Sequence, residues 1–196
     1  TWSVRLWASR AAVHYPALVE LLYVLYLRVV KQLWYNPGMK KKDIKALVLI
    51  SGGLDSILAA WLIRQQGIEI KGLIFESVFF DYQRGVQAAK QLNIPYEVID
   101  ISKKLLEAIE SPEHGFGGAA NPCIDCHLIM LKKSKEILDK ENFNFVATGE
   151  VIGQRPFSQN KEAMELLATK SGLNELLVRP LSAQKLEPTG PEKKGW

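Results

Sequence analysis

The short stretch SGGLDS brings two glycines, two hydroxyl groups and a carboxylate together between two apolar runs. Gly52 and Gly53 let the backbone turn tightly and approach a ligand closely. The N–H groups exposed there, the dipole of a following helix and the hydroxyl groups of Ser51 and Ser56 form an anion site. A carboxylate would repel bound phosphate, so Asp55 is predicted to bind Mg²⁺ that bridges to the phosphates. The structural alternative is that Ser and Asp cap a helix after a tight turn.

The second chemical motif is a pair of cysteines, Cys123 and Cys126, whose spacing places them on one face of a helix. At a helix start, the dipole and exposed N–H groups lower the pKa of a thiol and favour the thiolate. Three interpretations are open: sulfur relay through a persulfide that the second thiol resolves, ligation of an iron–sulfur cluster or zinc, and two buried thiols without chemistry. Two cysteines are few for a metal site, where three or four ligands are usual. His127 is interpreted as a helix residue near the thiols, and His114 is assigned no role.

A third polar segment, ATGEVIGQRPFSQN (147–160), follows an apolar run. Gly149 and Gly153 permit a close approach, Glu150 is a candidate ligand for Mg²⁺ or a ribose, and Arg155 is a candidate to neutralise phosphate. The alternative is a surface loop that carries an Arg–Glu pair.

These motifs lie at the ends of alternating strand and helix patterns. Continuous or alternating apolar runs predict strands at 44–50, 68–77, 96–101, 143–149 and 175–181. Helical spacing predicts helices at 56–67, 82–93, 102–109, 122–142 and 158–172. In the helix 122–142, Asn121 is expected to cap and Pro122 to occupy the first position. The alternation predicts an α/β fold with a Rossmann-like parallel sheet of about five strands, helices on both faces, and ligands at the carboxyl ends of the strands.

The composition, with 47% apolar and 23% charged residues, is ordinary for a globular protein. The two cysteines form no disulfide framework, which favours a reducing, cytoplasmic setting. The formal net charge is +4, but most of it comes from residues 1–38, so charge is only weak support for RNA binding.

Residues 1–38 differ from the remainder of the chain. The segment 17–34 is strongly apolar, yet Glu20 and Arg28 leave an uncharged run too short to span a bilayer, so no membrane partner is expected. It is interpreted either as an amphipathic or buried helix, or as part of an extension that is not native to a domain beginning at Met39. The second interpretation is favoured, and 1–38 is predicted to be a helical extension.

The motifs together resemble a known family. SGGLDS matches the SGGxDS signature of the PP-loop ATP pyrophosphatases, whose fold is the adenine nucleotide alpha-hydrolase-like variant of the Rossmann fold. Asn121, Pro122 and Cys126 match the Asn-Pro-x-x-x-Cys of the tRNA 2-thiouridine synthases, and a still closer resemblance is to stand-alone proteins akin to tRNA 4-thiouridine synthase, which carry Cys-x-x-Cys and Gly-Glu-x-x-Gly-Gln-Arg-Pro. The resemblance covers 44–196, and it places a domain at 39–196 that is expected to be truncated at its carboxyl end.

The resemblance implies an ATP-dependent tRNA uridine sulfurtransferase. In that family the loop grips the pyrophosphate of MgATP while the uracil oxygen is adenylated, and a sulfur nucleophile, here at Cys126 or Cys123, then displaces AMP. The implied partners are tRNA and a sulfur donor such as a cysteine desulfurase or a sulfur carrier, and the oligomeric state is left open. A cluster at the two cysteines would need ligands from outside this sequence. These 196 residues do not contain the distant second cysteine or the rhodanese and RNA-binding domains of some relatives. Either Cys123 takes the role of the second cysteine, or the missing parts lie beyond Trp196 or on another chain.

Two other functions compete with thiolation. One is an amidating PP-loop synthetase, in which ammonia attacks the adenylated carbon, and the other is a nucleotide-binding sensor that never turns ATP over.

Overall fold

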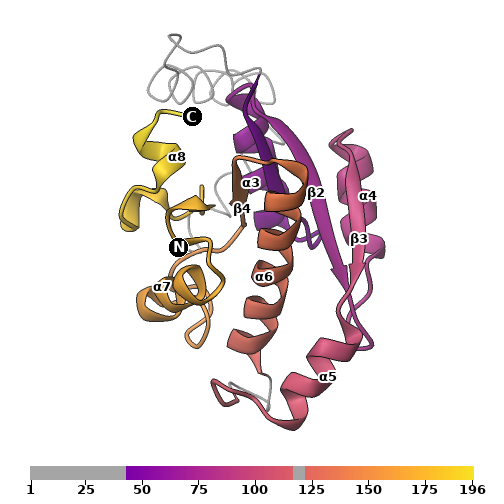
Figure 1. The fold of residues 1–196 in the computed structure, drawn as a ribbon. Coiled ribbons are helices and arrows are strands. Elements are labelled where there is room, and N and C mark those ends of the chain that lie inside the picture. The colour runs from indigo at the N-terminus through magenta and orange to yellow at the C-terminus, as the bar shows by residue number, and fades with distance from the viewer. Residues whose placement is uncertain (1–42, 117–121) are drawn as a thin grey trace, which may run out of the picture. The chain divides into compact units, whose positions relative to one another are not determined.

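The computed structural model describes residues 43–116 and 122–196 (Figure 1). The extension predicted at 1–38, the apolar segment 17–34, the proposed start at Met39 and the cap at Asn121 lie outside the described residues. Residues Lys40–Trp196 form one compact unit. Among the described helices, none combines the length and apolar character needed to cross a membrane.

A five-stranded parallel sheet forms the centre of this unit, in the order β3-β2-β1-β4-β5. The prediction of a Rossmann-like parallel sheet is therefore confirmed. The chain winds outward from β1 through β2 to β3 and then returns to the other side of β1 with β4. The strands are β1 (Lys45–Leu49), β2 (Glu69–Glu76), β3 (Tyr96–Asp100), β4 (Phe145–Ala147) and β5 (Leu177–Val178).

Helices connect the strands, mostly where helical spacing predicts them. They are α3 (Leu54–Gln65), α4 (Gln83–Gln91), α5 (Ser102–Glu110), α6 (Cys123–Glu141), α7 (Lys161–Lys170) and the short α8 (Gly190–Lys193), with 3₁₀ turns η3 (Asn174–Leu176) and η4 (Ala183–Lys185). Two boundaries correct the sequence prediction. Pro122 is the N-cap of α6 rather than its first residue, and a 3₁₀ turn replaces the beginning of the predicted strand 175–181.

Two apolar clusters hold the helices on opposite faces of the sheet. Ala46 and Val48 of β1 pack with α3 and α4, while Leu47 between them packs with α6 and α7. Side chains alternate across a strand, and here both faces are covered, which explains why β1 reads as a continuous apolar run. Leu47 and Val48 are fully buried, and such burial stabilises a fold by about 1.5–3 kcal/mol per side chain. Figure 1 shows α6 lying along one face of the sheet.

Candidate functional site

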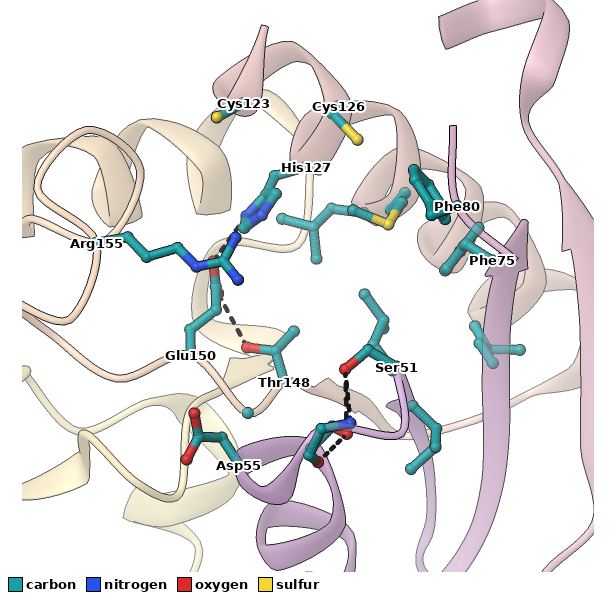
Figure 2. Close-up of a pocket in the computed structure, with 18 of the residues that line it drawn as sticks. Ser51, Asp55, Phe75, Phe80, Cys123, Cys126, His127, Thr148, Glu150 and Arg155 are labelled. Atoms are coloured by element: carbon teal, nitrogen blue, oxygen red, sulfur yellow. Dashed lines mark hydrogen bonds and ion pairs between the residues drawn. The ribbon is translucent and has the colours of Figure 1, made fainter. Parts of the chain in front are cut away.

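A cavity of about 770 Å³ lies at the carboxyl ends of β1, β2 and β4. The winding direction of the sheet reverses between β1 and β4, and crevices at such points bind ligands in open α/β sheets. Most of the residues that the sequence singles out line this cavity, namely Ser51, Gly53, Asp55, Ser56, Cys123, Cys126, Gly149, Glu150 and Arg155. In Figure 2 the two cysteines lie on one side of the cavity and Ser51 and Asp55 on the other.

The loop between β1 and α3, here called the PP-loop (residues 51–56), is held by its own hydroxyl groups. Ser51 Oγ accepts a hydrogen bond from Gly53 N–H and donates one to Ser56 Oγ, both at 3.3 Å. Ser56 Oγ also donates to the Gly53 carbonyl at 2.8 Å. Gly53 is the N-cap of α3 and no side chain caps this helix. The first N–H groups of α3 therefore face the cavity without a side-chain cap, as an anion site requires.

Two glycines allow the backbone segments around the PP-loop to meet. Gly52 has φ +80°, and a Cβ there would lie 2.5 Å from the backbone carbon of Arg84. A Cβ at Gly149 would lie 2.6 Å from the backbone of Asp55 and of Ser56. Gly149 thus brings the segment after β4 directly onto the PP-loop, so the predicted close approach is made to protein backbone.

Asp55 lies in the first turn of α3 and is half-buried at the cavity wall. Its Oδ2 accepts a hydrogen bond from Gln154 Nε2 at 3.0 Å. Since carboxylate oxygens each accept more than one bond, Asp55 retains the capacity to hold a hard cation such as Mg²⁺. Arg155, the next residue along from Gln154, is exposed and also lines the cavity.

Glu150 occupies a buried network instead of an open ligand position. Its Oε2 accepts hydrogen bonds from Arg179 Nε at 2.8 Å and Thr148 Oγ1 at 2.9 Å, and its Oε1 lies 3.1 Å from His127 Nδ1. Burial alone would raise the pKa of Glu150, but the hydrogen bond from His127 and the charge of Arg179 outweigh it and lower the pKa to about 2. Glu150 therefore links α6 with the segments after β4 and β5, and its contact with Mg²⁺ or a ribose stays a prediction.

The alternative interpretation of 147–160, a surface loop with an Arg–Glu pair, does not match the ion pair that Glu150 forms. Glu150 pairs with Arg179, which is buried, and not with the exposed Arg155. The sequence signal for Arg179 was available, since a charged residue directly after the apolar run 176–178 falls at the ligand-binding edge of the sheet.

The two cysteines are half-buried at the start of α6 and are both free thiols. Burial, with a smaller effect of Cys123, raises the pKa of the Cys126 thiol to about 11. The predicted helix-start activation is therefore wrong for Cys126. Its N–H already donates to the Pro122 carbonyl at 2.9 Å, so this thiol lies beyond the free donors of the first turn.

The cavity has an apolar wall, formed by side chains from β2, the segment after it, and α5. Leu73, Phe75, Phe79 and Phe80 lie on this wall, with Ile109 of α5. Phe75 and Phe80 appear across from Glu150 and Arg155 in Figure 2. Flat apolar walls of this kind suit planar rings such as nucleobases.

Comparisons with known proteins agree with the fold and with the motifs. Residues 44–172 match the family described as the tRNA methyl transferase HUP domain. A probable tRNA sulfurtransferase from Alkaliphilus metalliredigens is 32% identical over 143 residues, which cover 71% of this chain and 36% of that protein. The tRNA-specific 2-thiouridylase MnmA of Syntrophomonas wolfei is 34% identical over 90 residues, or 43% of this chain and 26% of that protein.

Solved structures share the fold. A 4-thiouridine synthetase in complex with RNA and bound ATP has a TM-score of 0.60 at 24% identity, covering 70% of this chain and 36% of that one. A protein of Methanocaldococcus jannaschii, described as a predicted subunit of a tRNA methyltransferase, has a TM-score of 0.52 at 24% identity, covering 70% and 69%. The resemblance drawn from the motifs is confirmed. The matched part of the chain spans 36% and 26% of the length of the two curated relatives named above.

Proposed function

This chain belongs to the tRNA methyl transferase HUP domain family, in the thiouridine synthase branch of the PP-loop enzymes, and from that premise we propose that it catalyses ATP-dependent thiolation of a tRNA uridine. One observation carries the proposal. A single cavity is lined both by the PP-loop, as an anion site, and by two thiols on α6. Adenylation modifies the oxygen of a substrate carbonyl group and sulfur transfer attacks its carbon, so both kinds of group must lie within reach of that one carbonyl.

The first step uses the PP-loop side of the cavity. The uracil carbonyl oxygen attacks the α-phosphorus of ATP, the bond to the bridging oxygen breaks, and pyrophosphate leaves. The N–H groups at the start of α3 and the hydroxyl groups of Ser51 and Ser56 stabilise the charge of the leaving group. Arg155 adds a guanidinium at the cavity wall. When bound at Asp55, Mg²⁺ would neutralise phosphate charge, and the free acceptor capacity of Asp55 fits that role.

The second step uses the thiol side. The terminal sulfur of a persulfide on one cysteine attacks the adenylated carbon, the carbon–oxygen bond breaks, and AMP leaves. The other cysteine then attacks the first, which releases the thiocarbonyl and leaves a disulfide between Cys123 and Cys126. An external thiol reductant returns two electrons, and a sulfur donor such as a cysteine desulfurase or a sulfur carrier reloads the persulfide. An iron–sulfur cluster fits less well, because this sequence holds two cysteines where three or four thiolates are usual.

Pyrophosphate release, measured with and without tRNA, tests the proposal. We expect release that depends on tRNA, its loss in Asp55→Asn with unchanged thermal unfolding, and normal release in Asp139→Asn, an exposed position on α6. The double variant Cys123→Ser with Cys126→Ser should still adenylate but form no thiouridine. Product formation from ammonia in that double variant would favour an amidating synthetase. Absence of release under all conditions would favour a nucleotide-binding sensor.

A further inference from the structure

A cluster of four side chains lies beside the thiols and belongs neither to the PP-loop nor to the Glu150 network. His114 N–H donates to Asp125 Oδ2 at 3.1 Å, and His114 Nδ1 lies 2.7 Å from Asp125 Oδ1. Lys170 Nζ lies 2.9 Å from His114 Nε2 and also donates to Glu113. The cluster joins the segment after α5, the first turn of α6 and the last residue of α7.

The hydrogen-bond partners of His114 favour one of its two neutral tautomers. A lysine ammonium has only donors, so His114 Nε2 must accept, and the proton of a neutral imidazole then lies on Nδ1 and is donated to Asp125. One carboxylate oxygen each from Glu113 and Asp125 and a ring nitrogen of His114 lie within 4.8 Å of one another, close enough for a metal site. The Lys170 ammonium already contacts Glu113 and His114, so the protein supplies its own cation there. The cluster is therefore a set of polar contacts that links three segments of the chain.

The first turn of α6 depends on such polar contacts to hold its position. The N-cap of α6 is Pro122, whose side chain cannot accept a hydrogen bond, and no side-chain cap forms among the described residues. Uncapped first turns fray, because their N–H groups lack partners. This same turn carries Cys123 and Cys126, and the Asp125 between them is buried. Asp125 points about 200° around the helix from Cys123, given about 100° per residue. Holding Asp125 from the flank therefore sets the rotation of the turn and the direction of both thiols.

We propose that His114 is a positioning residue for the sulfur-transfer half of the reaction, acting through Asp125 to aim the two thiols into the cavity. The inference rests on the proposed function for its meaning, but the positioning itself is a property of this chain. Because the PP-loop lies on the other side of the cavity, His114 has no part in ATP binding or adenylation.

Two substitutions separate the two bonds of the imidazole. In His114→Asn the amide nitrogen replaces Nδ1 and keeps the side-chain bond to Asp125, whereas His114→Gln places its polar end near Nε2 and, of the two side-chain bonds, keeps only the one to Lys170. The bond from the backbone N–H of residue 114 to Asp125 Oδ2 stays in both variants. Alkylation of Cys123 and Cys126 by iodoacetamide at fixed pH, followed by peptide mass spectrometry, reports how well the turn is held. We expect about tenfold faster alkylation in His114→Gln and near wild-type rates in His114→Asn, since the bond to Asp125 is shorter, at 2.7 Å, and more buried than the exposed contact with Lys170 at 2.9 Å.

Further measurements exclude a general loss of structure. ATP affinity and the thermal midpoint should be unchanged in His114→Asn and His114→Gln, and thiouridine formation should fall in parallel with the alkylation effect while adenylation persists. Lys170→Met should have a smaller effect than His114→Gln, and Lys161→Met, an exposed lysine at the other end of α7, none. If His114→Gln destabilises the fold, the alkylation rates of Lys170→Met and Lys161→Met are compared instead.

The outcomes are distinct. Equal alkylation rates in the wild type, His114→Gln and Lys170→Met would overturn the positioning role. A loss of ATP affinity in His114→Gln as large as its change in alkylation rate would also overturn it. If the wild-type chain forms no thiouridine while the alkylation pattern holds, the proposed function fails and the positioning of the thiols by His114 stands.

Discussion

Glu150 shows how one buried residue connects the parts of the site. Arg179 follows β5, Thr148 follows β4 and His127 lies on α6 beside Cys126, and all three meet on one carboxylate. Ser182 Oγ donates to the Glu150 backbone carbonyl at 2.9 Å as well. A buried charge is tolerated only when it is paired and fully hydrogen-bonded. Removal of one partner would leave a buried polar group without its hydrogen bond, so a single substitution in this network should lower the free energy of unfolding.

Glu150→Gln should therefore destabilise the fold in a pH-dependent manner. The pKa of Glu150 falls from 4.5 to about 2 on folding, so the carboxylate stabilises the fold above pH 4.5 and this contribution is lost as the pH falls towards 2. At pH 7 the variant should lose about 3–5 kcal/mol of unfolding free energy, because the Arg179 charge stays buried without its partner. The difference should shrink at pH 3. Urea unfolding at both pH values measures it.

The control for this prediction is Glu165→Gln, whose carboxylate is exposed and 4.0 Å from Lys161. It should change the unfolding free energy by about 0.5 kcal/mol or less. A pH-independent effect of Glu150→Gln would contradict the ionised, paired state of Glu150.

The Cys126 thiol should be unreactive at neutral pH. Since its pKa is raised to about 11 by burial and by Cys123, the thiolate fraction, and with it the rate of alkylation, should continue to rise up to about pH 11. The rate is followed by iodoacetamide labelling and tandem mass spectrometry, which assigns the label to Cys126 with Cys123 left in place. A rate that levels off near pH 8 would show instead that the helix start activates Cys126.

At the scale of elements, the site depends on how closely two loops approach. The PP-loop and the segment after β4 touch backbone to backbone at Gly149, and the Gln154–Asp55 hydrogen bond joins them again. These two contacts position the loops relative to each other. The geometry of the anion site thus depends on a residue outside the SGGLDS motif.

Gly149→Ala should displace the segment after β4 from the PP-loop, since a Cβ would lie 2.6 Å from the Asp55 and Ser56 backbone. A displacement near 1 Å is enough to cost about 10²-fold in turnover. Gly153→Ala, in the same segment, is the control, because it meets nothing within 4 Å and has only its φ of +81° to strain. Pyrophosphate release and thermal unfolding separate the two. Comparable turnover in the two variants would show that the contact between Gly149 and the PP-loop is not needed for activity.

The elements themselves were largely predictable, and their long-range contacts were not. β1 and β2 are buried on both faces and read as apolar runs, so their positions follow from local sequence. The Glu150–Arg179 bond joins residues 29 apart, and the order β1-β4-β5 that brings them together leaves no local signal. The same holds for His114, which meets Asp125 and Lys170 through tertiary packing alone.

At the scale of the whole molecule, the described unit brings its chemistry to one edge of the sheet. The PP-loop follows β1, the segment with Phe79 and Phe80 follows β2, and Gly149 and Glu150 follow β4. Helix α6 closes the cavity from the face that α7 also covers. Reversal of the winding between β1 and β4 opens the crevice that these segments line.

The division at Met39 remains a proposal and predicts how a shortened chain should behave. Among the described residues, both apolar clusters and the five strands of the sheet lie within residues 44–196. A protein of residues 39–196 should therefore fold, bind ATP as tightly as the full chain and melt no lower, as followed by circular dichroism and calorimetry. A protein of residues 51–196 is the matched control: it lacks β1, the strand that pairs with both β2 and β4, and should not fold. Aggregation of 39–196, or a thermal midpoint well below that of the full chain, would show that residues 1–38 contribute to the stability of this unit.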